Sequence, residues 1–105
     1  MSLDELLFAI SKLDKQKNWQ KQAPSDLAKS IIIEAAELLE HFQWDNTLTN
    51  RGDHIPEKDK KEIAFEVADI FVYLLKFCRE MDIDLMEVTQ EKLKIVAQKY
   101  PNVNN

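Results

Sequence analysis

One glycine and three prolines in 105 residues constrain this chain more than any other feature. Small sheets and barrels need many tight turns, and tight turns depend on glycine and proline. A single glycine also cannot build a phosphate-binding loop or a dinucleotide-binding fingerprint. The sequence therefore predicts helices joined by short connections. The length is that of one small domain, covering residues 1–105.

The composition is that of a folded protein, with 45% hydrophobic and 31% charged residues. The formal net charge of −5 argues against binding duplex nucleic acid, which requires a basic face. An anionic ligand is still compatible with this charge if a metal cation lies between the ligand and the protein.

Targeting and redox signals point to a cytoplasmic protein without membrane association. The sequence begins Met1-Ser2-Leu3-Asp4-Glu5, which is acidic where a signal peptide would be basic. The longest apolar run, residues 70–75, is far too short to span a membrane. The single cysteine, Cys78, excludes an intramolecular disulfide and a cysteine-based zinc site.

Helical periodicity and end signals predict four helices, over residues 3–18, 24–44, 57–80 and 85–98. Ser2 with Glu5 and Asp84 with Glu87 have the spacing of capping boxes at the first and fourth helices. Pro56 suits the first position of the third helix, and residues 45–54 have the composition of a loop. We therefore expect an all-α four-helix bundle.

The third helix is apolar over more than half of its circumference. What remains is a narrow polar strip, formed by Glu62, Glu66, Asp69, Tyr73, Lys76 and Glu80. A small monomer has little material with which to cover such a helix. We therefore expect a homo-oligomer, a dimer or a tetramer, in which this helix lies between subunits and its polar strip faces a cleft.

Two pairs of acidic residues lie in these apolar helices, Glu34 with Glu37 and Glu66 with Asp69. Each pair has i, i+3 spacing and so lies on one helix face. If the two helices are antiparallel neighbours, four carboxylates meet in one pocket, and a divalent cation would relieve their repulsion. Oxygen-only ligands favour Mg²⁺ or Mn²⁺.

Two other interpretations apply to acidic pairs of this kind. Such pairs also occur on ordinary solvated helix faces. A di-iron carboxylate centre is a second possibility, but it requires a Glu-x-x-His motif. Here His41 follows Glu37 by four residues, so that motif is absent.

At these residues the sequence resembles a known family. Glu34-Ala-Ala-Glu37 followed by Glu66-Val-Ala-Asp69 is similar to the ExxE…ExxD signature of the all-α nucleoside triphosphate pyrophosphohydrolases, in the branch of MazG-like proteins and dCTP pyrophosphatases. The similarity continues through Phe42-Gln43-Trp44, Tyr73 and the closing Lys99-Tyr100-Pro101, and it covers roughly residues 5–101.

The resemblance implies an Mg²⁺-dependent enzyme, with Mn²⁺ as a substitute, that converts a nucleoside triphosphate, and in particular a dNTP, to the monophosphate and pyrophosphate. Clearing unwanted nucleotides would be its role. By position, the metal ligands would be Glu34, Glu37, Glu66 and Asp69. The substrate-binding residues would be Trp19, Trp44, Tyr73 and Lys92. We favour Glu37 as the catalytic base that takes the proton from the attacking water.

Two positions depart from the family pattern. Gln22 stands where relatives often have histidine, and Val96 stands where they commonly have a ligand-contacting asparagine. A changed base or sugar preference would follow from these departures. They also support an alternative, a non-catalytic helical module that binds a nucleotide or a protein. Neighbouring enzymes of the superfamily, a dUTPase or a phosphoribosyl-ATP pyrophosphatase, are a further possibility.

Overall fold

The computed structural model describes residues 1–19, 21–43, 55–100 and 102. These residues form four helices and no strand: α1 (Leu3–Gln16), α2 (Pro24–Gln43), α3 (Glu57–Glu80) and α4 (Leu85–Lys99). The all-α class and the four helices are confirmed, with ends within two residues of those predicted. The predicted loop over residues 45–54 lies outside the described residues.

The capping residues predicted at the N-termini of α1 and α4 make the expected hydrogen bonds. Ser2 and Glu5 form a complete capping box at α1, each side chain bonding the other's backbone N–H. At α4, the Asp84 side chain accepts a hydrogen bond of 3.1 Å from the backbone N–H of Glu87. Pro56 is the residue that precedes α3, one position before the first helical residue.

Two helices end at residues with left-handed backbone conformation, Asn18 after α1 (φ 55°) and Asp82 after α3 (φ 54°). The N–H of Trp19 then donates to the carbonyl of Asp14 at 2.9 Å, and Ile83 makes the equivalent bond at the end of α3. This arrangement is the Schellman motif, which is usually formed by glycine. Asparagine and aspartate tolerate this conformation better than other side chains. The chain therefore ends both helices without using its glycine.

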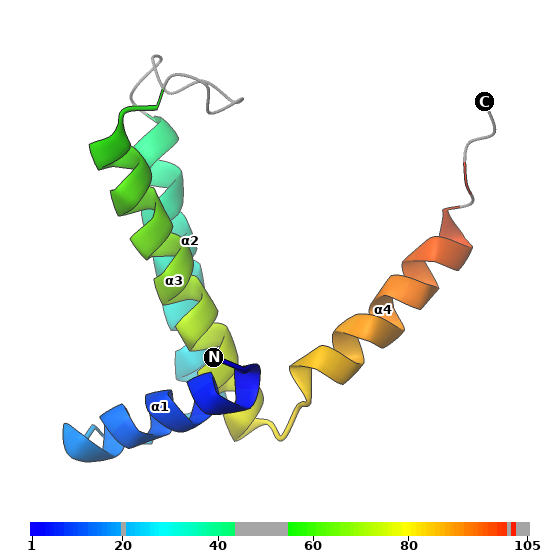
Figure 1. Cartoon of the computed structure of the whole chain (residues 1–105), viewed down its shortest axis with the longest axis horizontal. Helices are drawn as coiled ribbons and strands as arrows, with labels where there is room; N and C mark the ends of the chain where they lie inside the picture. The colour runs from blue at the N-terminus through cyan, green and yellow to red at the C-terminus, as the bar shows by residue number, and fades with distance from the viewer. Residues whose placement is uncertain (20, 44–54, 101, 103–105) are drawn as a thin grey trace.

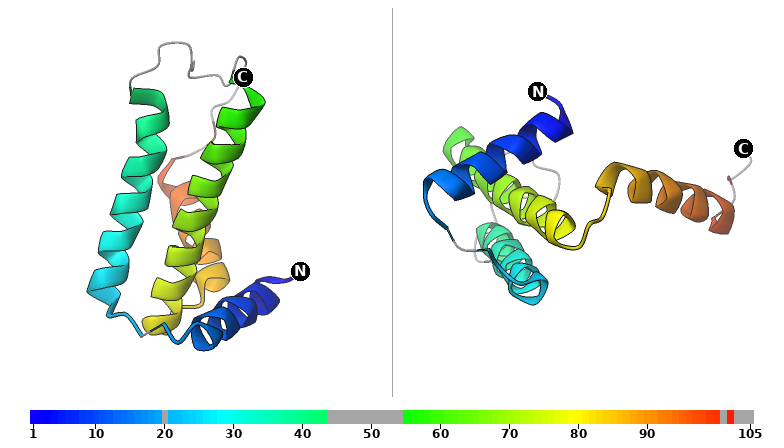
Figure 2. Two further views of the ribbon diagram at one scale, coloured as in Figure 1. Left: turned by 90° about the vertical axis from the view of Figure 1, so that its left-hand side faces the viewer. Right: turned by 90° about the horizontal axis from the view of Figure 1, so that it is seen from below.

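Helices α2 and α3 pack side by side in antiparallel directions, and α1 crosses near the end of α3 (Figures 1 and 2). Leu27 on α2 and Leu75 on α3 are each only 1% exposed, and Ile10 and Cys78 complete the buried core. This packing places polar side chains of α2 opposite polar side chains of α3. They lie along the line of contact between the two helices, which is called the seam below.

Helix α4 extends away from the other three helices (Figures 1 and 2), and none of its residues is buried. Its apolar side chains are therefore exposed, as are several on α2 and α3. The large ones are Ile32, Ile33, Leu39, Phe42, Phe65, Val67, Phe71, Leu74, Met86, Val88, Leu93, Ile95 and Val96. The accessible surface of 8924 Å² exceeds the roughly 6,100 Å² expected of a compact monomer of this mass. None of the described helices is long and apolar enough to cross a bilayer.

Candidate metal centre and the adjoining cavity

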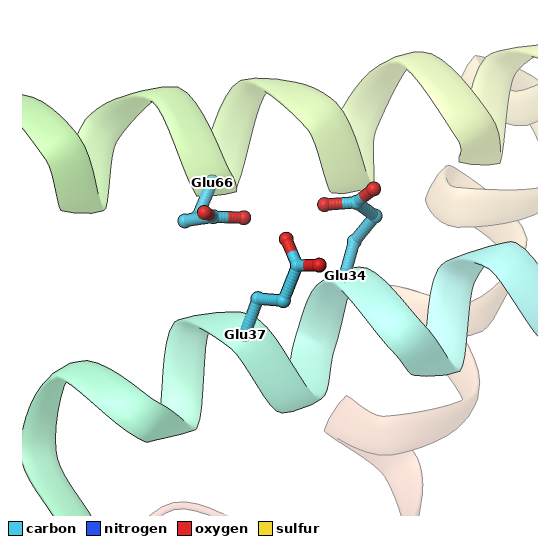
Figure 3. Close-up of side chains that lie close together, drawn as sticks. All are labelled: Glu34, Glu37 and Glu66. Atoms are coloured by element: carbon cyan, nitrogen blue, oxygen red, sulfur yellow. The ribbon is translucent and has the colours of Figure 1, made fainter.

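Three carboxylates meet between α2 and α3. Glu34 and Glu37 come from successive turns of α2, and Glu66 comes from the facing turn of α3 (Figure 3). One oxygen atom from each side chain lies within 4.8 Å of the others. The i, i+3 spacing on α2 and the antiparallel packing of α3 produce this convergence.

Burial raises the pKa of two carboxyl groups in this cluster. The Oε2 atoms of Glu34 and Glu66 are withdrawn from solvent, and neither has a hydrogen-bond partner among the residues that the structure describes. Burial, with the adjoining carboxylate of Glu37 as a further cause, raises the pKa of Glu34 to about 7. Burial and the same neighbour also raise the pKa of Glu66. Both shifts have the direction that burial and neighbouring carboxylates produce in an acidic group.

The donor set of this cluster fits a hard divalent cation. All the donors are carboxylate oxygens, which suit Mg²⁺ or Mn²⁺ and do not suit a metal that prefers sulfur or imidazole. The two buried oxygens, which have no partner in the described part of the chain, are the atoms that a cation would satisfy. Exposed acidic groups are common on helices, but these two atoms are not exposed.

Asp69, the fourth predicted ligand, stands at the edge of this group. Its side chain is exposed, and it is not among the three that converge. Its charge nevertheless contributes to the raised pKa of Glu34, which places it in electrostatic range. The structure thus brings together three of the four predicted ligands and leaves the fourth beside them.

A cavity of about 740 Å³ lies between the end of α1, α2 and the second half of α3. Of the predicted substrate-binding residues, Trp19 and Tyr73 line it. Tyr73 follows Asp69 by one turn of α3, so the cavity continues the seam that holds the carboxylates. Gln22, the position that departs from the family pattern, also lines the cavity.

The other two predicted substrate-binding residues do not join this cavity. Lys92 is exposed on α4, which extends away from α2 and α3 (Figure 1). Trp44 lies outside the described residues. Within one chain, the predicted substrate site is therefore formed by Trp19 and Tyr73, without Lys92.

Sequence reasoning missed a group of charged residues in the same cavity. Lys76 donates to Asp14 Oδ1 at 3.0 Å, and Arg79 donates to Asp14 Oδ2 at 3.2 Å. Arg79 also bonds Glu80 at 3.0 Å, and Lys21 lies 3.2 Å from the other Glu80 oxygen. Burial by itself raises the pKa of Glu80, but the two cations outweigh it and the pKa is lowered.

A signal for part of this group was present in the sequence, because Lys76 and Glu80 belong to the polar strip of the third helix. The partner of Lys76 is Asp14, which is 62 residues away. No local sequence pattern predicts an ion pair between residues that far apart in the chain.

The chain is similar in sequence and in fold to known proteins. The model of the MazG-like family matches residues 29–105. A pyrophosphatase from Archaeoglobus fulgidus has a similar crystal structure, with a TM-score of 0.84 and 36% sequence identity over 95% of this chain and 93% of that chain.

Two curated relatives are more distant in sequence. dCTP pyrophosphatase 1 of Mus musculus is 23% identical over 101 residues, and its Homo sapiens counterpart is 21% identical over 101 residues. In both cases the match covers 95% of this chain but only 59% of the relative. The family model and the structural similarity confirm the resemblance drawn from the acidic motifs, and the chain belongs to the MazG-like family.

Proposed function

We propose that this protein is an Mg²⁺-dependent nucleoside triphosphate pyrophosphohydrolase that converts a (d)NTP to the (d)NMP and pyrophosphate. The observation that carries the proposal is the convergence of Glu34, Glu37 and Glu66 within 4.8 Å, beside a cavity lined by Trp19 and Tyr73. Membership of the MazG-like family and similarity to proteins named as pyrophosphatases support the same activity.

Glu34, Glu37 and Glu66 would hold the cation, with Asp69 as an additional ligand beside them. A divalent cation bound there supplies positive charge for the triphosphate and lowers the pKa of a bound water. This charge is needed because a chain of net charge −5 does not attract a polyanion by itself.

The chemical step is attack of a water oxygen on the α-phosphorus. The bond from that phosphorus to the bridging oxygen breaks, and pyrophosphate leaves with the electron pair. We propose that Glu37 accepts the proton of the water, because it belongs to the converging group. The rings of Trp19 and Tyr73 would hold the nucleoside by stacking, a contact that contributes about 1–3 kcal/mol per base.

We propose a deoxynucleoside triphosphate as the preferred substrate, because the curated relatives are named dCTP pyrophosphatase 1. Removal of unwanted nucleotides from the cytoplasmic pool is the corresponding role. Gln22 lines the cavity. The glutamine at this position, where relatives often have histidine, would therefore change which base or sugar the enzyme prefers.

The active form is proposed to be a homodimer or homotetramer. The apolar side chains of α4, among them Leu93 and Ile95, are exposed within a single chain. Burying such side chains is favourable at about 25 cal/mol per Å². Lys92 lies on this same helix, so packing of α4 against a second copy would bring a basic residue toward the partner's surface.

The test is release of pyrophosphate from a panel of dNTPs and NTPs with Mg²⁺. We expect turnover of at least one substrate, dCTP being the first candidate. Glu37→Gln and Asp69→Asn should each lower turnover by about a hundredfold or more. Glu62→Gln, which changes an exposed carboxylate one turn before Glu66, should leave turnover unchanged.

Absence of turnover across the whole panel, with folded wild-type protein, would contradict the enzymatic proposal. Nucleotide binding without turnover would favour the non-catalytic binding module.

A further inference from the structure

The cavity beside the carboxylates contains a lysine placed between two aromatic rings. The Nζ atom of Lys76 lies 5.6 Å from the ring centroid of Trp19 and 5.7 Å from that of Tyr73. Both distances are within the range of a cation–π interaction. Lys76 lines the cavity, and its side chain is only 13% exposed.

The position of this lysine is fixed by Asp14. The ammonium group donates to Asp14 Oδ1 at 3.0 Å, and the Asp14 side chain is only 18% exposed. Asp14 also fixes one wall of the cavity, because its backbone carbonyl accepts the N–H of Trp19 at 2.9 Å. One residue of α1 therefore contacts both the ammonium group of Lys76 and the backbone of Trp19.

The charge of Lys76 is only partly neutralised. Asp14 shares its two oxygens between Lys76 and Arg79, and Arg79 in turn shares Glu80 with Lys21. Four cationic and two anionic side chains line the cavity, although the chain as a whole carries a net charge of −5. An ammonium group has three N–H donors, and Asp14 is the hydrogen-bond partner of Lys76 among the described residues.

We propose that Lys76 is a specificity-determining residue that donates a hydrogen bond to a ring carbonyl oxygen of the substrate's base, and that Asp14 is its positioning residue. The inference rests on the proposed function, because it assumes that the cavity receives the nucleoside. Two flanking rings favour a planar, stackable ligand over a phosphate group. Lysine is a donor without an acceptor, so an oxygen on the base edge is the matching group.

The direction of the seam agrees with this assignment. Lys76 lies ten residues after Glu66 on α3, a rise of about 15 Å. The negatively charged cluster and the positively charged cavity therefore lie at different heights along the same pair of helices. The triphosphate would extend toward the carboxylates and the base would lie at Lys76.

The experiment measures nucleoside binding by titration calorimetry in EDTA, so that neither metal nor catalysis is involved. The probes are 2′-deoxycytidine, which has a ring carbonyl, and 2′-deoxyadenosine, which has none. We expect wild type to bind deoxycytidine more tightly. Lys76→Met should weaken that binding about ten- to hundredfold, the usual effect of losing a hydrogen bond from a charged donor. The difference between the two nucleosides should disappear.

Matched variants separate recognition from folding. Lys76→Gln keeps N–H donors and should lose less affinity than Lys76→Met. Lys12→Met removes an exposed lysine of α1 and should bind as wild type does. Asp14→Asn should weaken deoxycytidine binding in wild type but have no further effect in the Lys76→Met background, which is the non-additivity expected of a positioning residue. A purely structural role of Asp14 would give additive losses.

Three results would overturn the proposal: no deoxycytidine binding by wild type, equal affinity for the two nucleosides, or unchanged binding in Lys76→Met. A further arm measures inorganic tripolyphosphate with Mg²⁺. An equally large loss there in Lys76→Met would make this lysine a phosphate contact and would also overturn the proposal. Pyrophosphate release by wild type is scored separately, so failure of this inference is distinguishable from failure of the proposed function.

Discussion

Glu34 on α2 and Glu66 on α3 face each other across the helix seam, each with an Oε2 atom that is withdrawn from solvent and has no hydrogen-bond partner among the described residues (Figure 3). Removing a carboxylate from water without pairing it is unfavourable. The helix pair is therefore expected to be less stable without a cation than its apolar packing allows. This relationship gives the first two predictions.

Neutralising one carboxylate should stabilise the protein in the absence of metal. We expect Glu66→Gln to raise the melting temperature in EDTA by a few degrees, because it removes repulsion with Glu34 and Glu37. Mg²⁺ should raise the melting temperature of wild type and have much less effect on Glu66→Gln. Differential scanning calorimetry with Glu62→Gln as the control measures both effects. Equal responses to Mg²⁺ in wild type and Glu66→Gln would exclude this cluster as the metal site.

Stability without metal should depend on pH through Glu34. Its pKa is raised from 4.5 to about 7 in the folded protein, so between these values the folded state binds more protons than the unfolded chain. The stabilising contribution is therefore complete below about pH 4.5 and is lost as the pH rises through about 7. Urea unfolding in EDTA should show a lower free energy of unfolding at higher pH across this window.

The matched variant for this effect is Glu34→Gln, which lacks the titrating group. The difference between wild type and Glu34→Gln should grow as the pH rises through the window. A constant difference would mean that Glu34 ionises normally.

A charge on the apolar face of α4 should disrupt assembly. Leu93 is 63% exposed in the single chain, and a carboxylate there would be costly to bury between copies. We expect Leu93→Glu to shift the protein toward the monomer in analytical ultracentrifugation, whereas Gln90→Glu should retain the assembly of wild type. A wild type that is monomeric at all concentrations would refute the oligomer proposal.

Truncating the buried side chain of Leu27 on α2 should be strongly destabilising. Leu27 is 1% exposed, and Leu→Ala substitutions at such sites cost about 2–5 kcal/mol. Urea denaturation should give a loss in this range for Leu27→Ala and a change below about 0.5 kcal/mol for Lys29→Ala, an exposed residue of the same helix. A loss below about 1 kcal/mol for Leu27→Ala would contradict the packing described for this side chain.

Much of the fold was predictable from the sequence because its signals are local. The capping pair Ser2 and Glu5 fixes the start of α1 within four residues of chain. The convergence of Glu34, Glu37 and Glu66 was predictable because helical spacing and antiparallel packing together determine it. The position of Asp69 at the edge of the cluster was not predictable, because it depends on the rotation of α3 about its own axis.

Other features depend on contacts between distant segments. Lys92 lies on α4, none of whose residues is buried, so its separation from the cavity could not be predicted from spacing on its own helix. Nothing in the local sequence distinguishes Asp14 from a solvated residue of the first helix, and only the crossing of α1 over α3 reveals it as the partner of Lys76.

The Schellman turn at Asn18 has a consequence for how the cavity recognises its ligand. Because the N–H of Trp19 is bonded to the end of α1, the backbone that carries the indole ring is held by the helix before any ligand arrives. A backbone held in this way loses little conformational entropy on binding, and that preorganisation increases affinity. Shape selection at this wall would then require no closing lid.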